Sequence, residues 1–519
     1  MKLKALIVLL LCSVATAQHP MDFVPDDAIG LLVINDGSAI NSILQTVDAQ
    51  SGMASATPDV LETFLSQYID NPNAIDFTSE VLVILEPTIT APGQKPAGMF
   101  GPMPHFMVVC KAKDGQTLKA NKASGLTTEA LKDGWFIATG ATKWSTRTSE
   151  KLSPIVEKLP ETNVALVIEF AAIWSKFSPI IQMTGGMAVS GLNSPGPDGV
   201  ITPETKRAAK SAQSAFGNAM KEFADVKAIT GGFDFEDFTA VVTFDIESIS
   251  GKSPKIDNSS MIEMASSLAS SGAQHAMSEK LTRKLMELDF EALQEFAGSA
   301  GDYANFITPA YRKLAELTEL NVGSCDVSGE KGFTVAVLGE YSNQNEYMKL
   351  VPEVIVSSAE ALEQYYSMEL STADASYKWN VSIMSDDAEY VDVMNAVVPK
   401  GTQVRFGKQG SDRIAMMFGP KNWKAFTSPH SSALAQVIKP HARNVEIDYA
   451  MSMNFRKFAV GVMEIDTIAN GEDSRLSVKD SPSAKNSILF GTTETGTFIE
   501  IKSDLYGLAT LVSELDIAE

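Results

Sequence analysis

Short apolar runs and helical patterns alternate along the first part of the chain. The strand-like runs cover residues 28–34, 81–85, 105–111 and 135–139. The helical patterns cover 38–47, 58–69 and the region near 116–123. The resulting order β-α-β-β-α-β predicts a ferredoxin-like unit, in which helices cover one face of an antiparallel sheet.

A breaker-rich loop separates the second of these strands from the third. Residues 87–104 contain five prolines and three glycines, a density that leaves no room for a regular element. Met99, Phe100 and Met103 lie among the breakers. Exposed apolar side chains on a polar surface often mark contact sites, so these three residues are the candidate binding residues. The alternative is a flap that folds its apolar residues back onto the sheet.

A second series of patterns begins at Asn163 with the strand-like run NVALVIEF. An apolar helix from Ala171 follows, then a second helix after residue 203, and then a strand hairpin at 228–246. The pattern of residues 251–320 predicts mainly helix, with an apolar stripe formed by Leu281, Leu285, Leu288, Ala292 and Phe296. Strand patterns return between 322 and 502, and a helix at 503–515 closes the chain.

Part of this pattern occurs twice. The run NVALVIEFAAIWSKF resembles NVEIDYAMSMNFRKF, and their first residues, Asn163 and Asn444, are 281 positions apart. A strand-like run and a tryptophan precede each copy, and a strand hairpin follows each. Apolar strands resemble one another by chance, which is the alternative explanation. We interpret the similarity as a duplicated α+β unit, with copies at about 20–250 and 321–519.

These patterns together predict an α+β fold of two related domains, each a mainly antiparallel sheet covered by helices. The expected organisation is a signal peptide at 1–17, a first α+β domain at 18–250, a helical connecting segment at 251–320 and a second α+β domain at 321–519.

The amino terminus has the three parts of a signal peptide. Lys2 and Lys4 precede the apolar run 5–11, and Ala15 and Ala17 stand just before Gln18. Small residues at these two positions suit a signal peptidase. No later run reaches the roughly 20 apolar residues that cross a bilayer. We therefore expect an exported protein, periplasmic or extracellular, with no transmembrane segment after removal of the signal.

The net charge of the chain limits the kinds of macromolecule that it can bind. The chain has 42 basic and 64 acidic residues, a net charge of −22. Such a surface repels the phosphate backbone of nucleic acids and anionic lipid head groups. We expect no nucleic-acid binding, and an envelope or extracellular macromolecule as the partner.

The signal peptide, the opening VPDDAIGLLVIND and the repeated strand-helix-hairpin pattern resemble large exported bacterial proteins of unknown function that carry a duplicated α+β unit. This resemblance covers most of the chain beyond the signal. It implies the fold class and the compartment. It supplies no catalytic residues.

Catalytic and metal-binding motifs do not emerge from the sequence. The five histidines are His19, His105, His275, His430 and His441. None lies in HExxH, and the chain contains no GxSxG motif. We therefore predict no catalytic residues, no metal site and no cofactor. Cys110 and Cys325 are predicted either to be buried thiols or to pair in an oxidising compartment.

The sequence thus favours a non-catalytic binding or structural protein of the envelope or the medium. The alternative is an extracytoplasmic hydrolase whose site is assembled from distant residues. A hydrolase would show a pocket that holds a histidine or a carboxylate pair of perturbed acidity. A binding protein would show a broad apolar or charged groove.

Mass spectrometry of protein purified from its native host tests the predicted export. The mature chain should begin at Gln18, because the signal peptide is removed during export. Intact Met1 on protein recovered from the cytoplasm would contradict this prediction.

Overall fold

The structure is a computed structural model that describes most of the chain beyond its first 19 residues. The described residues are 20–51, 60–86, 105–121, 123, 125–140, 153–192, 203–268, 272–286, 309–328, 332–351, 367–373, 378–384, 390–393, 396–399, 402–409, 413–420, 432–470 and 485–516. The predicted signal peptide and the loop at 87–104 lie outside them.

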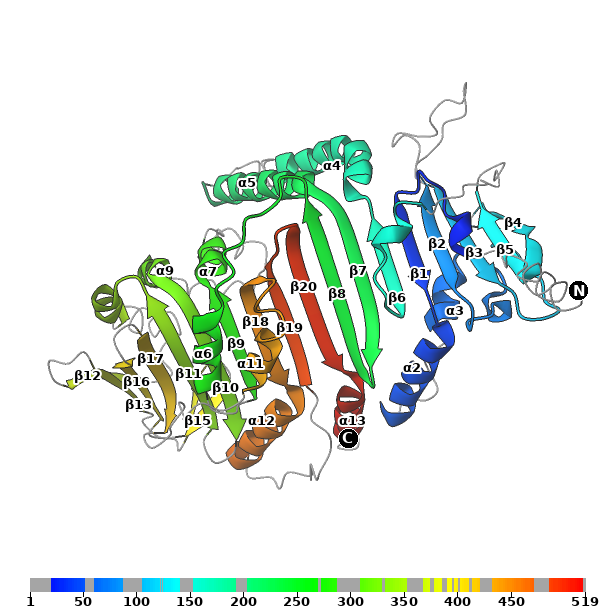
Figure 1. Ribbon diagram of the computed structural model, residues 1–519. Helices are drawn as coiled ribbons and strands as arrows, with labels where there is room; N and C mark the ends of the chain where they lie inside the picture. Colours follow the sequence, from blue (N-terminus) through cyan, green and yellow to red (C-terminus); the bar gives the residue numbers. More distant parts are fainter. Residues whose placement is uncertain are drawn as a thin grey trace, which may run out of the picture. The chain divides into compact units, whose positions relative to one another are not determined.

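The fold is α+β with extensive antiparallel sheet, as predicted (Figure 1). Contacts divide the described residues into two compact units. The first unit contains the residues up to Ile180 together with Ala224–Ile249. The second contains Ile181–Phe223 together with the residues from Ser250 onward. Among the described residues, no helix combines the length and the apolar character that crossing a membrane requires.

The first unit is built on an antiparallel sheet. Its strands are β1 (Gly30–Ile34), β2 (Val81–Glu86), β3 (His105–Lys111), β4 (Thr127–Ala130), β5 (Trp135–Thr139), β6 (Val164–Ile168), β7 (Val226–Glu236) and β8 (Thr239–Ser248). They pair in the order β4-β5-β3-β2-β1-β6-β7-β8, and each of these pairings is antiparallel.

Apolar side chains cover both faces of this sheet. Helices α2 (Gly37–Ser51) and α3 (Val60–Leu65) pack on one face, where Leu65 joins Val81 and Val83 in a buried cluster. On the other face, Phe23 packs with Leu82 and Ile84. Because the side chains of a strand alternate between faces, a strand with two covered faces is apolar throughout. This explains the unbroken run VLVIL that made β2 visible in the sequence.

The helix predicted near 116–123 is wrong. Residues 116–121 run extended beside the end of α3, where Asp70 N donates to Lys119 O at 2.8 Å and Asn121 N donates to Tyr68 O at 2.8 Å. Leu118 is buried in the core under α2 and α3. Tertiary packing therefore overrides the local helical pattern. Without this helix, and with β1 antiparallel to both neighbours, the ferredoxin-like arrangement is not confirmed.

The second unit contains a longer antiparallel sheet. Its strands are β9 (Ala273–Ser278), β10 (Thr318–Ser328), β11 (Gly332–Tyr341), β12 (Ser367–Ala373), β13 (Lys378–Met384), β16 (Thr402–Gln409), β17 (Arg413–Pro420), β18 (Glu446–Asn454), β19 (Lys485–Thr492) and β20 (Gly496–Asp504). Their order is β12-β13-β16-β17-β11-β10-β9-β18-β19-β20. Strands β14 (Tyr390–Val393) and β15 (Ala396–Pro399) form a separate hairpin.

Strand β9 is an element that the sequence analysis did not predict within 251–320. Helices α6 (Ser259–Ser267), α7 (Glu279–Met286) and α9 (Pro309–Glu316) do lie there. Between α6 and α7, however, the six residues AQHAMS pair with β10 on one side and β18 on the other. These residues have low β-propensity and no apolar alternation, so the strand owes its existence to its two neighbours.

The same strand order occurs in both units. Counted along the chain, the eight strands of the first sheet lie in the order 4-5-3-2-1-6-7-8. In the second sheet, β9, β10, β11, β16, β17, β18, β19 and β20 lie in the same order. Helix α2 follows the first strand of one unit and α7 that of the other. Likewise, α4 (Phe170–Leu192) follows β6 and α12 (Phe455–Asn470) follows β18.

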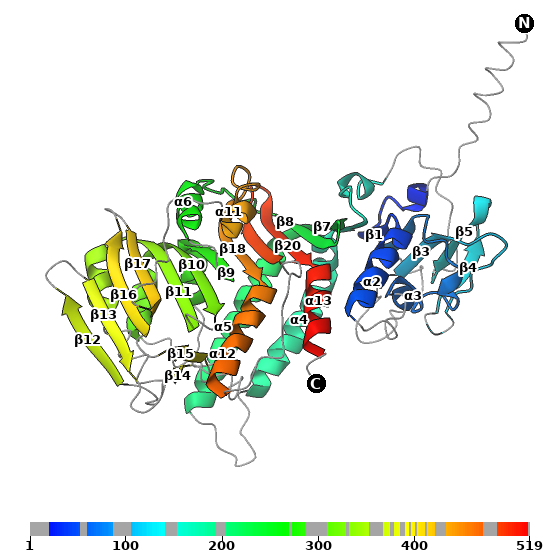
Figure 2. The ribbon, with the colours of Figure 1, turned by 90° about the horizontal axis from the view of Figure 1, so that it is seen from below.

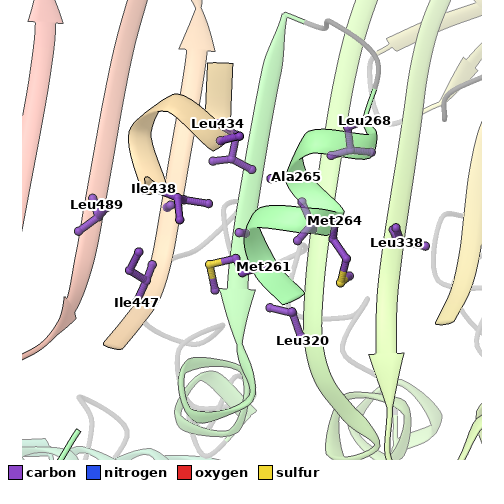
Figure 3. Close-up of a cluster of buried hydrophobic side chains, with 14 of the residues drawn as sticks. Met261, Met264, Ala265, Leu268, Leu320, Leu338, Leu434, Ile438, Ile447 and Leu489 are labelled. Atoms are coloured by element: carbon purple, nitrogen blue, oxygen red, sulfur yellow. The ribbon is translucent and has the colours of Figure 1, made fainter. Parts of the chain in front are cut away.

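Helices α6 and α11 (Ala433–Ile438) cover one face of the second sheet (Figure 3). Met264 of α6, Leu268 directly after α6 and Ile438 of α11 pack over the strands (Figure 3). Polar groups fix both helices in place. The carboxamide of Asn258 donates to Val445 O at 2.8 Å and accepts from Ile447 N at 3.1 Å, and Gln274 Oε1 accepts from Leu434 N at 3.1 Å.

Helix α12 lies on the opposite face of this sheet (Figure 2). Its Gly461 approaches β10 so closely that a Cβ atom there would lie 2.0 Å from Val327 O. The contact is with backbone, which has no room to move aside. The remaining long helices are α5 (Pro203–Asp225) and α13 (Leu505–Asp516).

Replacing Gly461 with alanine should therefore destabilise the protein. We expect Gly461→Ala to lower the free energy of unfolding by about 1–3 kcal/mol, because α12 must shift away from β10. Urea unfolding followed by circular dichroism measures this change.

Gly217→Ala is the matched control, since nothing lies within 4 Å of a Cβ atom built on this mid-helix glycine. This variant should be about 0.5–1 kcal/mol more stable than the wild type, because alanine favours helix. Equal effects of the two substitutions would contradict the close approach of α12 to β10.

Candidate ligand-binding pocket

A cavity of about 340 Å³ lies in the second unit, on the face of the sheet opposite α6 and α11. Strands β9, β10, β11 and β17 form its floor, and α7, α9 and the helical residues 344–351 form its walls. Its aliphatic lining includes Met277, Leu285, Met286, Leu314, Val337 and Met416. Three tyrosines, Tyr311, Tyr341 and Tyr347, also line it.

Strand alternation explains which side chains reach the cavity. Ala276 of β9 is fully buried under α6 and α11, so its neighbours His275 and Met277 point to the other face. The same holds on β11, where Val337 lines the cavity between two residues of the opposite core. The cavity and the core thus lie on opposite faces of the same strands.

A glycine makes room for His275. In the register of β9 and β10, His275 stands opposite Gly323. A Cβ atom at Gly323 would lie 2.3 Å from Cε1 of His275 and 2.9 Å from Nε2, so the imidazole lies across the bare backbone of β10. Burial lowers the pKa of His275 below its ordinary value of 6.5. The ring is therefore uncharged at neutral pH.

Two polar side chains at the floor of the cavity lack hydrogen-bond partners. Within the described part of the chain, neither the imidazole of His275 nor the carboxamide of Asn321 has one. The two hydroxyls nearby are engaged: Thr282 Oγ1 donates to Ser278 O at 3.0 Å, and Thr318 Oγ1 donates to Leu314 O at 3.0 Å. Unpaired polar groups in a largely buried site are normally satisfied by water or a ligand.

Two tyrosines in close ring contact line the cavity. The ring centroids of Tyr341 and Tyr347 are 3.7 Å apart, with an interplanar angle of 32°, and both side chains are buried. Burial raises the pKa of Tyr341 to about 12 and that of Tyr347 well above 10. Both phenols are neutral at physiological pH. Tyr311, in contrast, is 39% exposed.

The described lining is therefore apolar, aromatic and without charge. It contains no lysine, arginine, aspartate or glutamate, and its neutral polar groups come from both the strands and the helices. Such a surface suits an uncharged organic molecule. Over the residues that the structure describes, no group of three or more histidine, cysteine, aspartate or glutamate side chains could hold a metal ion.

Among the candidate binding residues and histidines named in the sequence analysis, one lines the cavity. Met99, Phe100 and Met103 lie outside the described residues, as do His19 and His430, so the binding loop stays a prediction. His105 begins β3 in the first unit. His441 Nε2 lies 3.1 Å from Glu500 Oε1. Burial raises the pKa of Glu500, but the hydrogen bond and charge of His441 outweigh burial and lower it. Only His275 lines the cavity.

The two cysteines among the described residues, Cys110 and Cys325, are free thiols. Cys110 is buried in the core of the first unit, and Cys325 is half-buried on β10. Burial raises the pKa of each thiol to about 12. Thiols of such high pKa are poor nucleophiles, so neither cysteine is a candidate catalytic group.

Comparison with known proteins adds no functional information. No family model matches the chain, and no curated protein is significantly similar to it. Among solved structures, crystal form III of TP0453 matches at 8% sequence identity over 51% of this chain and 99% of that chain, with a TM-score of 0.22. Crystal form IV matches over 48% and 96%, also at 8% identity and a TM-score of 0.22. Similarity this low supports neither a common fold nor a common function.

The burial of His275 predicts a pH-dependent stability. Its folded-state pKa is depressed, so below about pH 6.5 the unfolded chain takes up a proton at this position that the folded chain does not. Proton uptake at His275 in the unfolded chain therefore lowers the free energy of unfolding as the pH falls through that range. The urea midpoint of the wild type should drop more between pH 7.5 and 5.5 than that of His275→Gln. Equal drops in the two proteins would show that His275 is as well solvated when folded as when unfolded.

Proposed function

We propose that this is an exported, non-catalytic binding protein whose second unit holds a small apolar molecule in the cavity at β9. The observation that carries the proposal is the cavity itself. Its size lies in the range of small-molecule sites, and its lining combines apolar walls with a few convergent polar groups. Export is supported by the signal-peptide pattern of residues 1–17.

The cavity floor is held rigidly. The strands that present His275, Asn321 and Val337 also pack, through their alternate residues, into the core under α6 and α11. Any displacement of the floor would therefore disturb that core. A site that keeps its shape without a ligand loses little entropy when one binds, which favours affinity.

The shared strand order of the two units supports a common origin, with a packed core in the first unit and a binding cavity in the second. We propose that both descend from one eight-strand unit, as their common strand order and the 281-residue offset of Asn163 and Asn444 suggest. On this basis β9 and α7 correspond to β1 and α2, so the second copy begins before β9 and not at 321. In the first unit the face below α2 and α3 carries a packed apolar core, whereas the second unit has the cavity below α7.

A hydrolase is the alternative function, because His275 lines the cavity and burial lowers its pKa. A base of this kind needs a nucleophile beside it and a third group that orients it. Among the described lining residues, the threonine hydroxyls donate to backbone carbonyls and no carboxylate is present. Binding is therefore the function that the geometry favours.

A substitution that fills the cavity tests this proposal. N-phenyl-1-naphthylamine is a neutral apolar probe whose fluorescence rises when it leaves water. The wild type should bind it, and Val337→Phe should weaken binding by about tenfold or more, because the added ring occupies the site. Fluorescence titration at constant pH measures both affinities.

Val462→Phe provides the matched control, because Val462 is 46% exposed on α12 and does not line the cavity. Its affinity for the probe should equal that of the wild type. Equal weakening in both variants, or no binding by the wild type, would contradict the proposed site.

A further inference from the structure

We infer that the ligand of this cavity is an uncharged molecule with an apolar ring or chain and a single hydroxyl or carbonyl group, and that this group contacts His275 and Asn321. The inference rests on the proposed function and specifies the class of ligand. It is drawn from two properties of the cavity, the position of its unpaired polar groups and the absence of charge in its described lining.

The unpaired polar groups lie together on the floor. In the register of β9 and β10, Asn321 stands opposite Met277, and Gly323 stands opposite His275. His275 and Asn321 are thus diagonal neighbours on the same face of the sheet, a separation that long side chains span. A neutral imidazole offers one donor and one acceptor, and a carboxamide offers both. One hydroxyl or carbonyl oxygen placed between them can bond to both.

Other polar side chains of the described lining have partners of their own: the two threonine hydroxyls donate to backbone carbonyls, and Tyr341 and Tyr347 share a hydrogen bond. Leu285 and Met286 of α7 and Leu314 of α9 supply apolar contact. A second polar group on the ligand would lose its hydration and would compete with these existing bonds. The site therefore favours molecules with one polar end.

An anionic ligand is disfavoured by the same reasoning. A carboxylate between His275 and Asn321 would need a counter-charge, and burial disfavours the protonated imidazole that could supply one. No lysine or arginine stands among the described lining residues. A buried anion without a partner is strongly disfavoured. The predicted class is therefore alcohols, phenols and ketones, and not free fatty acids.

Three naphthalene derivatives of similar size test the inference with the full mature chain. They are 1-naphthol, 1-methylnaphthalene and 1-naphthoate, which differ in one substituent that is hydroxyl, methyl or carboxylate. Each is titrated against bound N-phenyl-1-naphthylamine at pH 8, and its affinity is obtained from displacement. The hydroxyl should give about three- to tenfold tighter binding than the methyl group, the range expected of one added neutral hydrogen bond. The carboxylate should bind at least about tenfold more weakly than the hydroxyl.

Variants of His275 and Asn321 test whether these two side chains cause the preference for naphthol. His275→Phe and Asn321→Leu should abolish the preference for naphthol over methylnaphthalene and leave the affinity for methylnaphthalene within about twofold. His275→Gln retains a donor and an acceptor and should retain the preference. Circular dichroism spectra of all variants establish that the fold is preserved.

The outcomes separate this inference from the proposed function. If the three compounds displace the probe equally, the cavity binds apolar molecules and the assignment of ligand class is wrong. Preferential binding of naphthoate would overturn it as well. If none of the compounds and no probe binds to the wild type, the proposed function itself fails.

Discussion

The pairing of β9 with β10 on one side and β18 on the other is the interaction on which the second unit depends. This six-residue strand joins the half of the sheet that contains β11 and β17 to the half that contains β19 and β20. Its pleat sends Gln274 and Ala276 toward α6 and α11 and sends His275 and Met277 toward the cavity. A register slip of one residue would place an imidazole in the apolar core and would remove the polar floor of the cavity.

The two units show how one strand order supports different interiors. In the first unit, Leu61 and Leu65 of α3 fill the space over β2 and β3 with aliphatic side chains. In the second, helices α7 and α9 stand over β9, β10 and β11 and leave a cavity of about 340 Å³. If the units descend from one ancestor, as we propose, the corresponding face carries a packed core in the first unit and a cavity in the second.

Much of the strand framework was predictable from the sequence, and the cavity was not. Strands such as β2 and β5 are covered on both faces, so each appears as an unbroken apolar run. Strand β9 carries glutamine, histidine and serine, and only its neighbours make it a strand. The segment 116–121 has a helical pattern, but Leu118 is held extended by the core. The cavity draws its lining from residues as far apart as His275 and Met416, a separation that no local pattern reveals.

The most direct measurement is the nuclear magnetic resonance of the histidine rings in the full chain, with His275 assigned from the His275→Gln variant. If the cavity binds neutral apolar molecules at β9, adding 1-naphthol will shift the ring signals of His275 in a saturable manner. The signals of the other histidines will stay in place. Saturable binding of 1-naphthol that leaves the His275 signals unmoved would place the ligand elsewhere and contradict the account.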